Sequence, residues 1–174
     1  MKKLLPSMYQ AKLIYISCIL YSCSMTALAN IPKLDSKQPV QIVADHASFD
    51  HKLGVAVYEG NVYVKQGSRN LTADKLTLKR DAKNRIKVMV ATGNPARFHS
   101  QQNPSKAPGS GSANIIKYYP QLDKVDLFEH AKLMQNGDTI TGPTLSYNFV
   151  TEVLQSKSSK LERTTVILQP KRAP

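Results

Sequence analysis

The stretch VYEGNVYVKQGSRNLTADKLTL, residues 57–78, alternates apolar and polar side chains almost throughout and is interrupted only at Gly60 and around Gly67. A period of two puts the apolar side chains on one face of a β-strand. Glycines between such runs mark turns or bulges. The stretch carries no cluster of residues typical of catalysis. It therefore predicts a sheet with one buried face, and it raises the question of what that face holds.

The same period continues through the rest of the chain after residue 30, where no convincing amphipathic helix occurs. Gly, Asp, Pro and Asn-Gly separate the runs at spacings of about 8–12 residues. This pattern predicts an all-β domain of antiparallel strands, folded as a sandwich, jelly roll or barrel. The Ser-, Pro- and Gly-rich segment 100–112 is predicted to be an extended surface loop, because it is too polar for a strand.

An internal repeat is indicated at an offset of 69 residues, because the apolar pattern of 44–78 recurs in 113–147. Both copies keep steps of two and then skip by three, at positions 71, 73, 76, 78 and at positions 140, 142, 145, 147. A step of three turns the side chains to the other face unless one residue bulges out. Pro143 occupies a skipped position in the second copy. We therefore predict two similar, stacked β units whose long strands bend at a fixed point.

The first 29 residues have the features of a secretory signal peptide. They combine a basic start, an apolar run at 13–25 and an Ala-x-Ala site at 27–29, so cleavage is predicted before Asn30. An uncleaved membrane anchor is the alternative, but the apolar run is short for a membrane span. The folded domain is then expected at 30–169, followed by a flexible tail at 170–174.

Cleavage would remove both cysteines, Cys18 and Cys23, so the exported domain is expected to have no disulfide. Lipid attachment at Cys23 is a second alternative for this segment. Loss of the three lysines in the signal peptide lowers the formal net charge from +12 to +9. A basic exported protein favours an acidic partner such as a phosphorylated envelope molecule.

Motifs for catalysis, cofactors and metals are missing from the sequence. It has no P-loop, no Rossmann fingerprint and no metal-ligand spacing, so no enzyme activity, cofactor or metal is predicted. Asp123 and Asp126 stand in turn-like polar sequence and are predicted to be solvated rather than a catalytic pair. The basic run 75–87 is predicted to be either a solvated hairpin turn that protects a sheet edge or a rim that contacts phosphate groups.

Several short motifs in a fixed order resemble those of a known family. They are QPVQIVADHASFD (38–50), YEGNVYVKQG (58–67), TADKLTL (72–78) and GNPARF (93–98). With the signal peptide and the second β unit, they resemble the OstA-like (LptA) family of periplasmic lipopolysaccharide-transport proteins, over roughly residues 36–168. The resemblance implies an open, twisted β-jelly roll with a hydrophobic interior. It also implies carriage of lipopolysaccharide from the inner-membrane complex towards the outer membrane.

The resemblance further implies five residues that line or gate the lipid A path: Val40, Ile42, Arg80, Phe98 and Tyr118. The implied protein partners are an LptC-like inner-membrane protein and an LptD-like outer-membrane protein. The terminal segments 40–44 and 164–169 are expected to be edge strands, and unpaired edges recruit further strands, so head-to-tail self-association is predicted.

The relative energies of apolar burial and charge contacts favour an apolar groove as the main lipid-holding element. Burying an acyl chain of about twelve carbons is worth on the order of 10 kcal/mol, at ~0.8 kcal/mol per CH₂. An exposed phosphate contact to Lys or Arg gives only about 1 kcal/mol. Three other classes are alternatives: an envelope adaptor that binds proteins by its edges without lipid, a jelly-roll enzyme, and a nucleic-acid binder. The missing catalytic motifs disfavour the second, and the predicted export disfavours the third.

Overall fold

The computed structural model describes residues 35–100, 109–135, 137–158 and 162–170, all within the compact unit Lys33–Pro174. The predicted signal peptide and residues 171–174 lie outside the described residues. Apart from one 3₁₀ turn, η1 (Asp35–Lys37), the regular structure of the described residues is all strand. The strands are β1 (Val40–Val43), β2 (His46–Asp50), β3 (Val55–Gln66), β4 (Arg69–Arg80), β5 (Ile86–Ser100), β6 (Gly109–Tyr119), β7 (Lys124–Gln135), β8 (Asp138–Asn148), β9 (Leu154–Lys157) and β10 (Thr165–Ile167).

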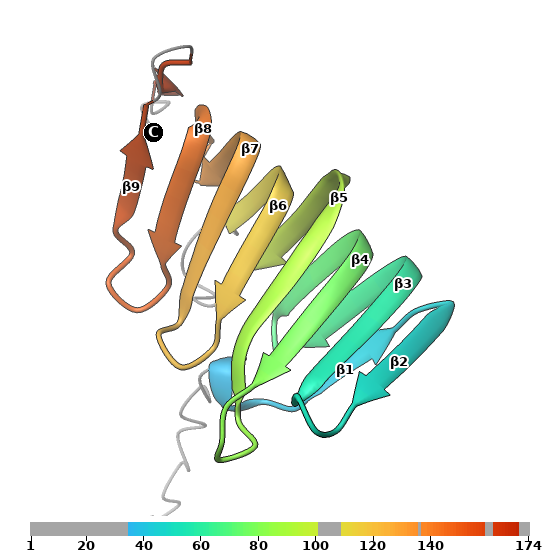
Figure 1. The fold of residues 1–174 in the computed structure, drawn as a ribbon. Coiled ribbons are helices and arrows are strands. Elements are labelled where there is room, and N and C mark those ends of the chain that lie inside the picture. Colours follow the sequence, from blue (N-terminus) through green and yellow to red (C-terminus); the bar gives the residue numbers. More distant parts are fainter. Residues whose placement is uncertain (1–34, 101–108, 136, 159–161, 171–174) are drawn as a thin grey trace, which may run out of the picture. The chain divides into compact units, whose positions relative to one another are not determined.

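All ten strands belong to one antiparallel sheet, in the order β1-β3-β4-β5-β6-β7-β8-β10. Strand β2 also pairs with β3, along the half of β3 that β1 does not cover. In the same way, β9 pairs with the half of β8 that β10 does not cover. Figure 1 shows that the sheet is open, with β1 and β2 at one edge and β9 at the other. The prediction of an open, antiparallel all-β fold is confirmed.

The long strands β3 to β8 each bend near the middle, where the pairing register shifts. One half of each strand lies in a layer that begins with β1 and ends with β10, the β1/β10 layer. The other half lies in a layer that begins with β2 and ends with β9, the β2/β9 layer. The bends join the two layers along one side, and the hairpin turns at the far strand ends form the opposite side, which we call the open end (Figure 1).

The bends confirm the internal repeat at an offset of 69. Between β3 and β4, Gly60 and Asn61 lie opposite the single residue Asp74; between β7 and β8, Glu129 and His130 lie opposite Pro143. Each position in the second copy is 69 residues after its counterpart. The four residues of the two bulged pairs also share a positive φ, of 78° and 44° in the first copy and of 62° and 56° in the second. The predicted units are therefore real, and they continue one another within a single sheet.

The core lies between the two layers and draws its side chains from both. Its five largest fully buried side chains are Leu76, Ile116, Leu127, Leu145 and Val62. Burial follows the predicted skip, because Leu71 and Ala73 point towards the core before the bend of β4, and Leu76 and Leu78 do so after it. The bulge thus keeps one face of every bent strand inward in both layers.

The prediction of a surface loop over 100–112 is wrong at both ends. Ser100 ends β5, and Gly109–Ser112 begin β6 and pair with Arg97–Ser100; residues 101–108 lie outside the described residues. A polar Gly-Ser run can join the buried sheet here because the Phe98 ring covers Gly111. A Cβ atom at position 111 would lie only 2.3 Å from Cε1 of that ring.

Candidate functional site

A small apolar cavity lies between the layers near the open end. Its volume is about 50 Å³, and it is lined by Val64, Gln66, Arg69, Asn70, Leu71, Met89, Phe98, His99, Ile116, Tyr118, Val125 and Phe149. A water molecule needs roughly 10–15 Å³ of such space, so the cavity has room for only a few waters. The interior is therefore largely filled by its own side chains, and a lipid tail could enter only if the layers moved apart.

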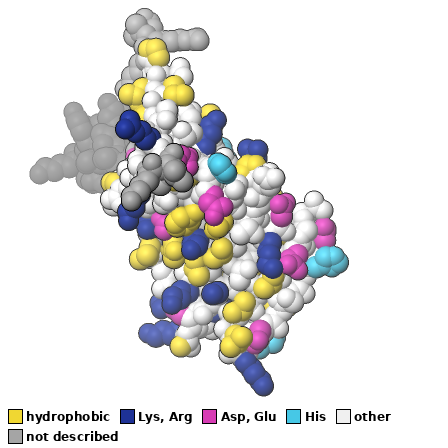
Figure 2. Space-filling model, turned by 45° about the horizontal axis from the view of Figure 1, so that its top comes forward, with side chains coloured by type: hydrophobic (Ala, Val, Ile, Leu, Met, Phe, Trp, Pro, Cys, Tyr) yellow, Lys and Arg dark blue, Asp and Glu magenta, His cyan; other side chains and the backbone are white. Residues whose placement is uncertain are grey.

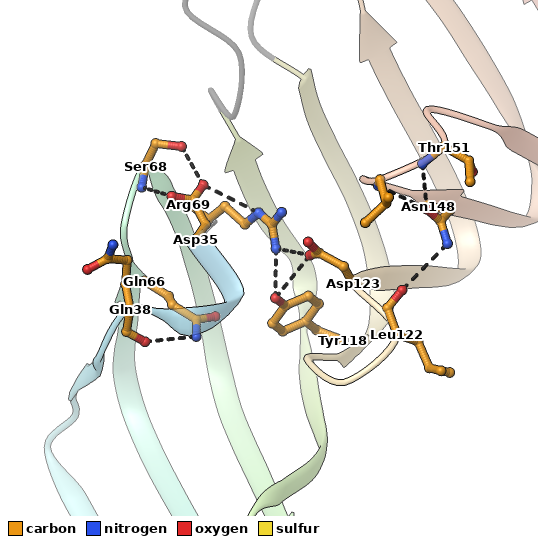
Figure 3. Close-up of polar contacts among 11 residues, drawn as sticks. Asp35, Gln38, Gln66, Ser68, Arg69, Tyr118, Leu122, Asp123, Asn148 and Thr151 are labelled. Carbon is orange, nitrogen blue, oxygen red and sulfur yellow. Dashed lines mark hydrogen bonds and ion pairs between the residues drawn. The ribbon is translucent and has the colours of Figure 1, made fainter. Parts of the chain in front are cut away.

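Arg69 crosses the open end from one layer to the other. It is the first residue of β4, in the β1/β10 layer, and its guanidinium is paired with Asp123 in the turn after β6, in the β2/β9 layer. Nη1 also donates to the Tyr118 hydroxyl at 2.7 Å. On the other side, Nε lies 3.6 Å from a carboxylate oxygen of Asp35 in η1. Figure 3 shows Arg69 between these two carboxylates.

Asp35 is itself held in place by the turn that follows β3. Its carboxylate accepts hydrogen bonds from the backbone N–H of Ser68 at 2.9 Å and from the Ser68 hydroxyl at 2.5 Å. The side chains of Asp35, Arg69 and Asp123 are each at most 9% exposed. Buried charges are tolerated only when they are paired in this way.

Aromatic rings pack around the Arg69 guanidinium. Its Cζ lies 3.9 Å from the centre of the Phe149 ring, a favourable cation–π geometry. Phe149 also meets Phe98, Tyr118 and Tyr147 edge to face, with ring centres 6.3, 6.4 and 5.1 Å apart. Because Phe98 belongs to the β1/β10 layer and Phe149 follows β8 in the other, these rings close the open end together with Arg69.

Tyr118 is kept neutral by its surroundings. Burial raises the pKa of Tyr118 to about 12; the nearby Asp123 carboxylate adds to the rise, and Arg69 opposes it. The hydroxyl therefore stays protonated at physiological pH. It accepts the hydrogen bond from Arg69 and donates a longer one, of 3.4 Å, to Asp123.

A larger depression lies between η1 and β1 on one side and the turns before β5 and after β6 on the other. Its volume is about 550 Å³, and it is lined by Lys37, Gln38, Val40, Gln66, Arg85, Ile86, Pro120 and Gln121. We call it the N-terminal groove. Gln66 lines both this groove and the central cavity, so the two lie on either side of one residue. Apolar Val40 and Ile86 lie in it together with the cations Lys37 and Arg85, a combination suited to a ligand that is partly apolar and partly anionic.

The structure brings together some of the five predicted lipid-path residues. Phe98 and Tyr118 line the central cavity, and Val40 lines the N-terminal groove. Ile42 is half-buried and packs against the core from β1. Arg80 lines neither; it is exposed at the end of β4 and donates to the carbonyl of Asn84 at 3.2 Å.

The prediction that Asp123 is a solvated turn residue is wrong. It does lie in a turn, but it is only 5% exposed and pairs with Arg69. Asp126 fits the prediction little better, because its side chain is 14% exposed and pairs with Lys124 of the same strand at 3.0 Å. Arg69 was not among the predicted site residues. One signal was available: in β4 the inward positions are 69, 71 and 73, so Arg69 stands where an apolar residue is expected.

The basic run 75–87 forms the β4–β5 hairpin, but β4 and β5 are central strands, so the predicted protection of a sheet edge is wrong. Several of its cations have nearby partners, such as Lys75 with Glu59 at 2.8 Å and Arg85 with Asp81 at 2.7 Å. The backbone N–H and guanidinium of Arg85 hold the pKa of the Asp81 carboxyl well below its usual range. On the face shown in Figure 2, the Lys and Arg side chains lie apart, between neutral and apolar ones, rather than in one patch.

Within the described ranges, no group of three or more His, Cys, Asp and Glu side chains is placed to hold a metal ion. Among the same residues, no helix has the length and apolar character needed to cross a membrane. What the described residues do present is an open, bent sheet with an apolar interior and a partly cationic groove beside it. These features define the class of small β-jelly rolls that can enclose apolar ligands between two layers.

The chain belongs to the family described as "LptA/(LptD N-terminal domain) LPS transport protein", which matches residues 41–153. It is 33% identical over 145 residues to the lipopolysaccharide export system protein LptH of Pseudomonas aeruginosa, with 79% of this chain and 83% of LptH covered. It is 32% identical over 160 residues to LptA of Escherichia coli K12, covering 89% of this chain and 86% of LptA. This confirms the family resemblance read from the sequence.

Two further comparisons agree. The crystal structure of LptH from P. aeruginosa, described as the LptA homologous periplasmic component of a lipopolysaccharide transport device, matches with a TM-score of 0.75 and 32% identity, over 79% of this chain and all of that one. The LPS-assembly protein LptD of Histophilus somni is 35% identical over 113 residues, which is 56% of this chain and 14% of LptD. The fold is therefore that of LptH.

Proposed function

We propose that this protein is a periplasmic carrier that holds the acyl chains of lipopolysaccharide between its two layers while the molecule moves towards the outer membrane. The observation that carries the proposal is the apolar interior beside a groove with apolar and cationic walls, in a fold shared with the lipopolysaccharide export proteins LptH and LptA. Relatives named for lipopolysaccharide transport favour this role over an adaptor without lipid.

The two parts of the site divide the work of binding. Burying each CH₂ group of an acyl chain is worth ~0.8 kcal/mol, so apolar side chains such as Phe98 and Val40 supply most of the holding energy. An exposed cation adds about 1 kcal/mol or less per contact. Lys37 and Arg85 at the N-terminal groove therefore orient the phosphorylated head group. The carrier role requires no chemical turnover by this chain, and the energy for directed movement comes from another component.

Site-specific photocrosslinking in cells tests the lipid path. A photoreactive residue at Phe98 or Val40 should crosslink to lipopolysaccharide, because these side chains line the cavity and the groove. The neighbours Arg97 and Gln41 are exposed on the opposite face of the same strands and serve as matched controls. Equal crosslinking from inward and outward positions, or none from either, would refute the proposal.

We also propose that the two sheet edges bind protein partners. Strands β1 and β2 pair only with β3, and β9 and β10 pair only with β8, within the part of the chain described. Such edges offer backbone groups to an added strand. An LptC-like inner-membrane protein, an LptD-like outer-membrane protein and a second copy of this chain are the proposed partners. In a head-to-tail pair, β1 would continue from β10 and β2 from β9, so both layers would extend without interruption.

Light scattering over a concentration series tests the self-association. Replacing Ile167 of β10 with proline should abolish the larger species, because proline lacks the N–H that an added strand would need. An unchanged size series in I167P, or a monomer at millimolar concentration, would contradict edge pairing. Val40→Asp distinguishes the lipid carrier from the adaptor alternative. An adaptor should keep its partner binding in this variant, and its lipid crosslinking should stay at the same background level as in the wild type.

A further inference from the structure

The bent sheet has two very different sides. Along the bends, the layers are joined covalently by every long strand from β3 to β8. At the open end the strand ends of the two layers can separate, and side chains hold them together. A motion that parts the layers would therefore turn about the bends and would first have to break contacts such as those of Arg69.

The contacts at the open end join residues that are far apart in the sequence. Arg69 of the β1/β10 layer meets Asp123, Tyr118 and Phe149 of the β2/β9 layer. By contrast, the ion pair of Lys124 with Asp126 lies within one strand and does not join the layers. The Arg69 cluster also forms one wall of the central cavity.

We propose that Asp35, Arg69 and Asp123, with Phe149 stacked on the guanidinium, form a latch that keeps the layers closed while the interior is empty and opens to admit an acyl chain. This rests on the proposed function, because it takes the acyl chain as the ligand. The cavity behind the latch, at about 50 Å³, is too small for such a chain in the closed state. Admission therefore requires opening at this end.

The chemistry of the cluster suits a closure that can be released. A buried ion pair gains Coulomb energy but loses hydration, and the two nearly balance. When the layers part, Asp123 and Arg69 regain water, which offsets the lost pair. The aromatic rings gain no such compensation, but an incoming acyl chain would cover Phe98 and Phe149 again. An apolar contact of the same size would lack the first of these offsets and would hold the layers shut more firmly.

Spin-label distance measurements test the opening without any lipid. Labels are placed on cysteines at Lys65 in the β1/β10 layer and Lys79 in the β2/β9 layer, both exposed near the open end, in a chain whose native cysteines are replaced by serine. The wild-type latch should give one narrow distance distribution. Asp123→Asn and Arg69→Met should each broaden it towards longer distances. Asp126→Asn is the matched control, because its carboxylate pairs within one strand and should leave the distribution unchanged.

Lipid uptake is measured on the same variants as the rate of lipopolysaccharide crosslinking from a photoreactive residue at position 98. The latch predicts several-fold faster uptake by D123N and R69M, and wild-type uptake by D126N. Folded D123N and R69M proteins that keep the narrow distribution and the wild-type rate would overturn the latch. Broadened distributions with no crosslink in any protein, including the wild type, would instead refute the proposed lipid function.

Discussion

Replacing Gly111 with alanine tests the close packing between β6 and β5. Gly111 pairs with Phe98, and an added Cβ atom would lie 2.3 Å from Cε1 and 2.8 Å from Cζ of the Phe98 ring, and 3.1 Å from Cδ2 of Leu127. The ring cannot move away freely, because Phe149 packs on it edge to face with ring centres 6.3 Å apart. The substitution must therefore push a buried ring off its position.

The expected cost follows from overpacking. Extra methyl groups in a packed core cost about 1–3 kcal/mol, whereas a Gly→Ala change itself returns about 0.4–1 kcal/mol through the unfolded state. We expect a net loss of about 1–2 kcal/mol in the free energy of unfolding. For a domain of this size that lowers the melting temperature by roughly 2–4 °C per kcal/mol.

Thermal and denaturant unfolding of matched variants provide the assay. Gly109→Ala is the control, because it lies two residues earlier in the same strand and its added Cβ would approach no atom of the described residues closer than 3.9 Å. That variant should be as stable as the wild type or slightly more so. Combining G111A with Phe98→Leu should recover part of the loss, as a double-mutant cycle detects. A G111A protein no less stable than G109A would refute the packing of the Phe98 ring over β6.

Three other predictions concern backbone strain and titrating groups. Gly60 has a φ of 78°, so Gly60→Ala should lower the free energy of unfolding by about 1–2 kcal/mol. Glu129 at the equivalent bulge has a φ of 62°, so Glu129→Gly should raise the free energy of unfolding, whereas Glu129→Gln should not. Urea unfolding measures both effects. The pKa of Tyr118 is raised to about 12 in the folded protein. Its contribution to the free energy of unfolding is therefore complete below about pH 10, the usual tyrosine pKa, and falls as the pH rises towards 12. The Y118F protein should therefore lose less stability over that range than the wild type does. Arg85→Ala should raise the pKa of the Asp81 carboxyl only part of the way to its usual value, because the backbone N–H bond persists; an NMR titration that shows no rise would contradict this.

The regular parts of the fold could be predicted because one local rule governs them. Inward positions repeat every two residues, and a skip of three reveals a bulge, so the bends at Asp74 and Pro143 and the 69-residue repeat were visible in the sequence. These features need no knowledge of which strands meet across the core. The second copy has Glu129 at the position equivalent to Gly60, so it lacks the glycine signal. Pro143 and the apolar pattern still indicated the second bend.

The predictions that were wrong concern features that depend on contacts between residues far apart in the sequence. Asp123 has the sequence context of a surface turn residue. Its burial is tolerated only because it pairs with Arg69, which lies 54 residues earlier in the chain. The Gly-Ser run before Ala113 reads as a loop, and only the Phe98 ring makes it part of the sheet. Of the predicted lipid-path residues, Phe98 and Tyr118 lie together in the cavity, but Arg80 lies away from it.

The matched bulges of the two repeats have a consequence for how the fold can grow. Because each bend occupies the same place in its own unit, the bends form one continuous line across the sheet from strand to strand. A third unit of the same length, inserted between the two, would lengthen the space between the layers and leave its cross-section unchanged. A single-residue deletion between a bulge and its hairpin would instead turn half a strand inside out, so the family should tolerate duplication far better than small gaps.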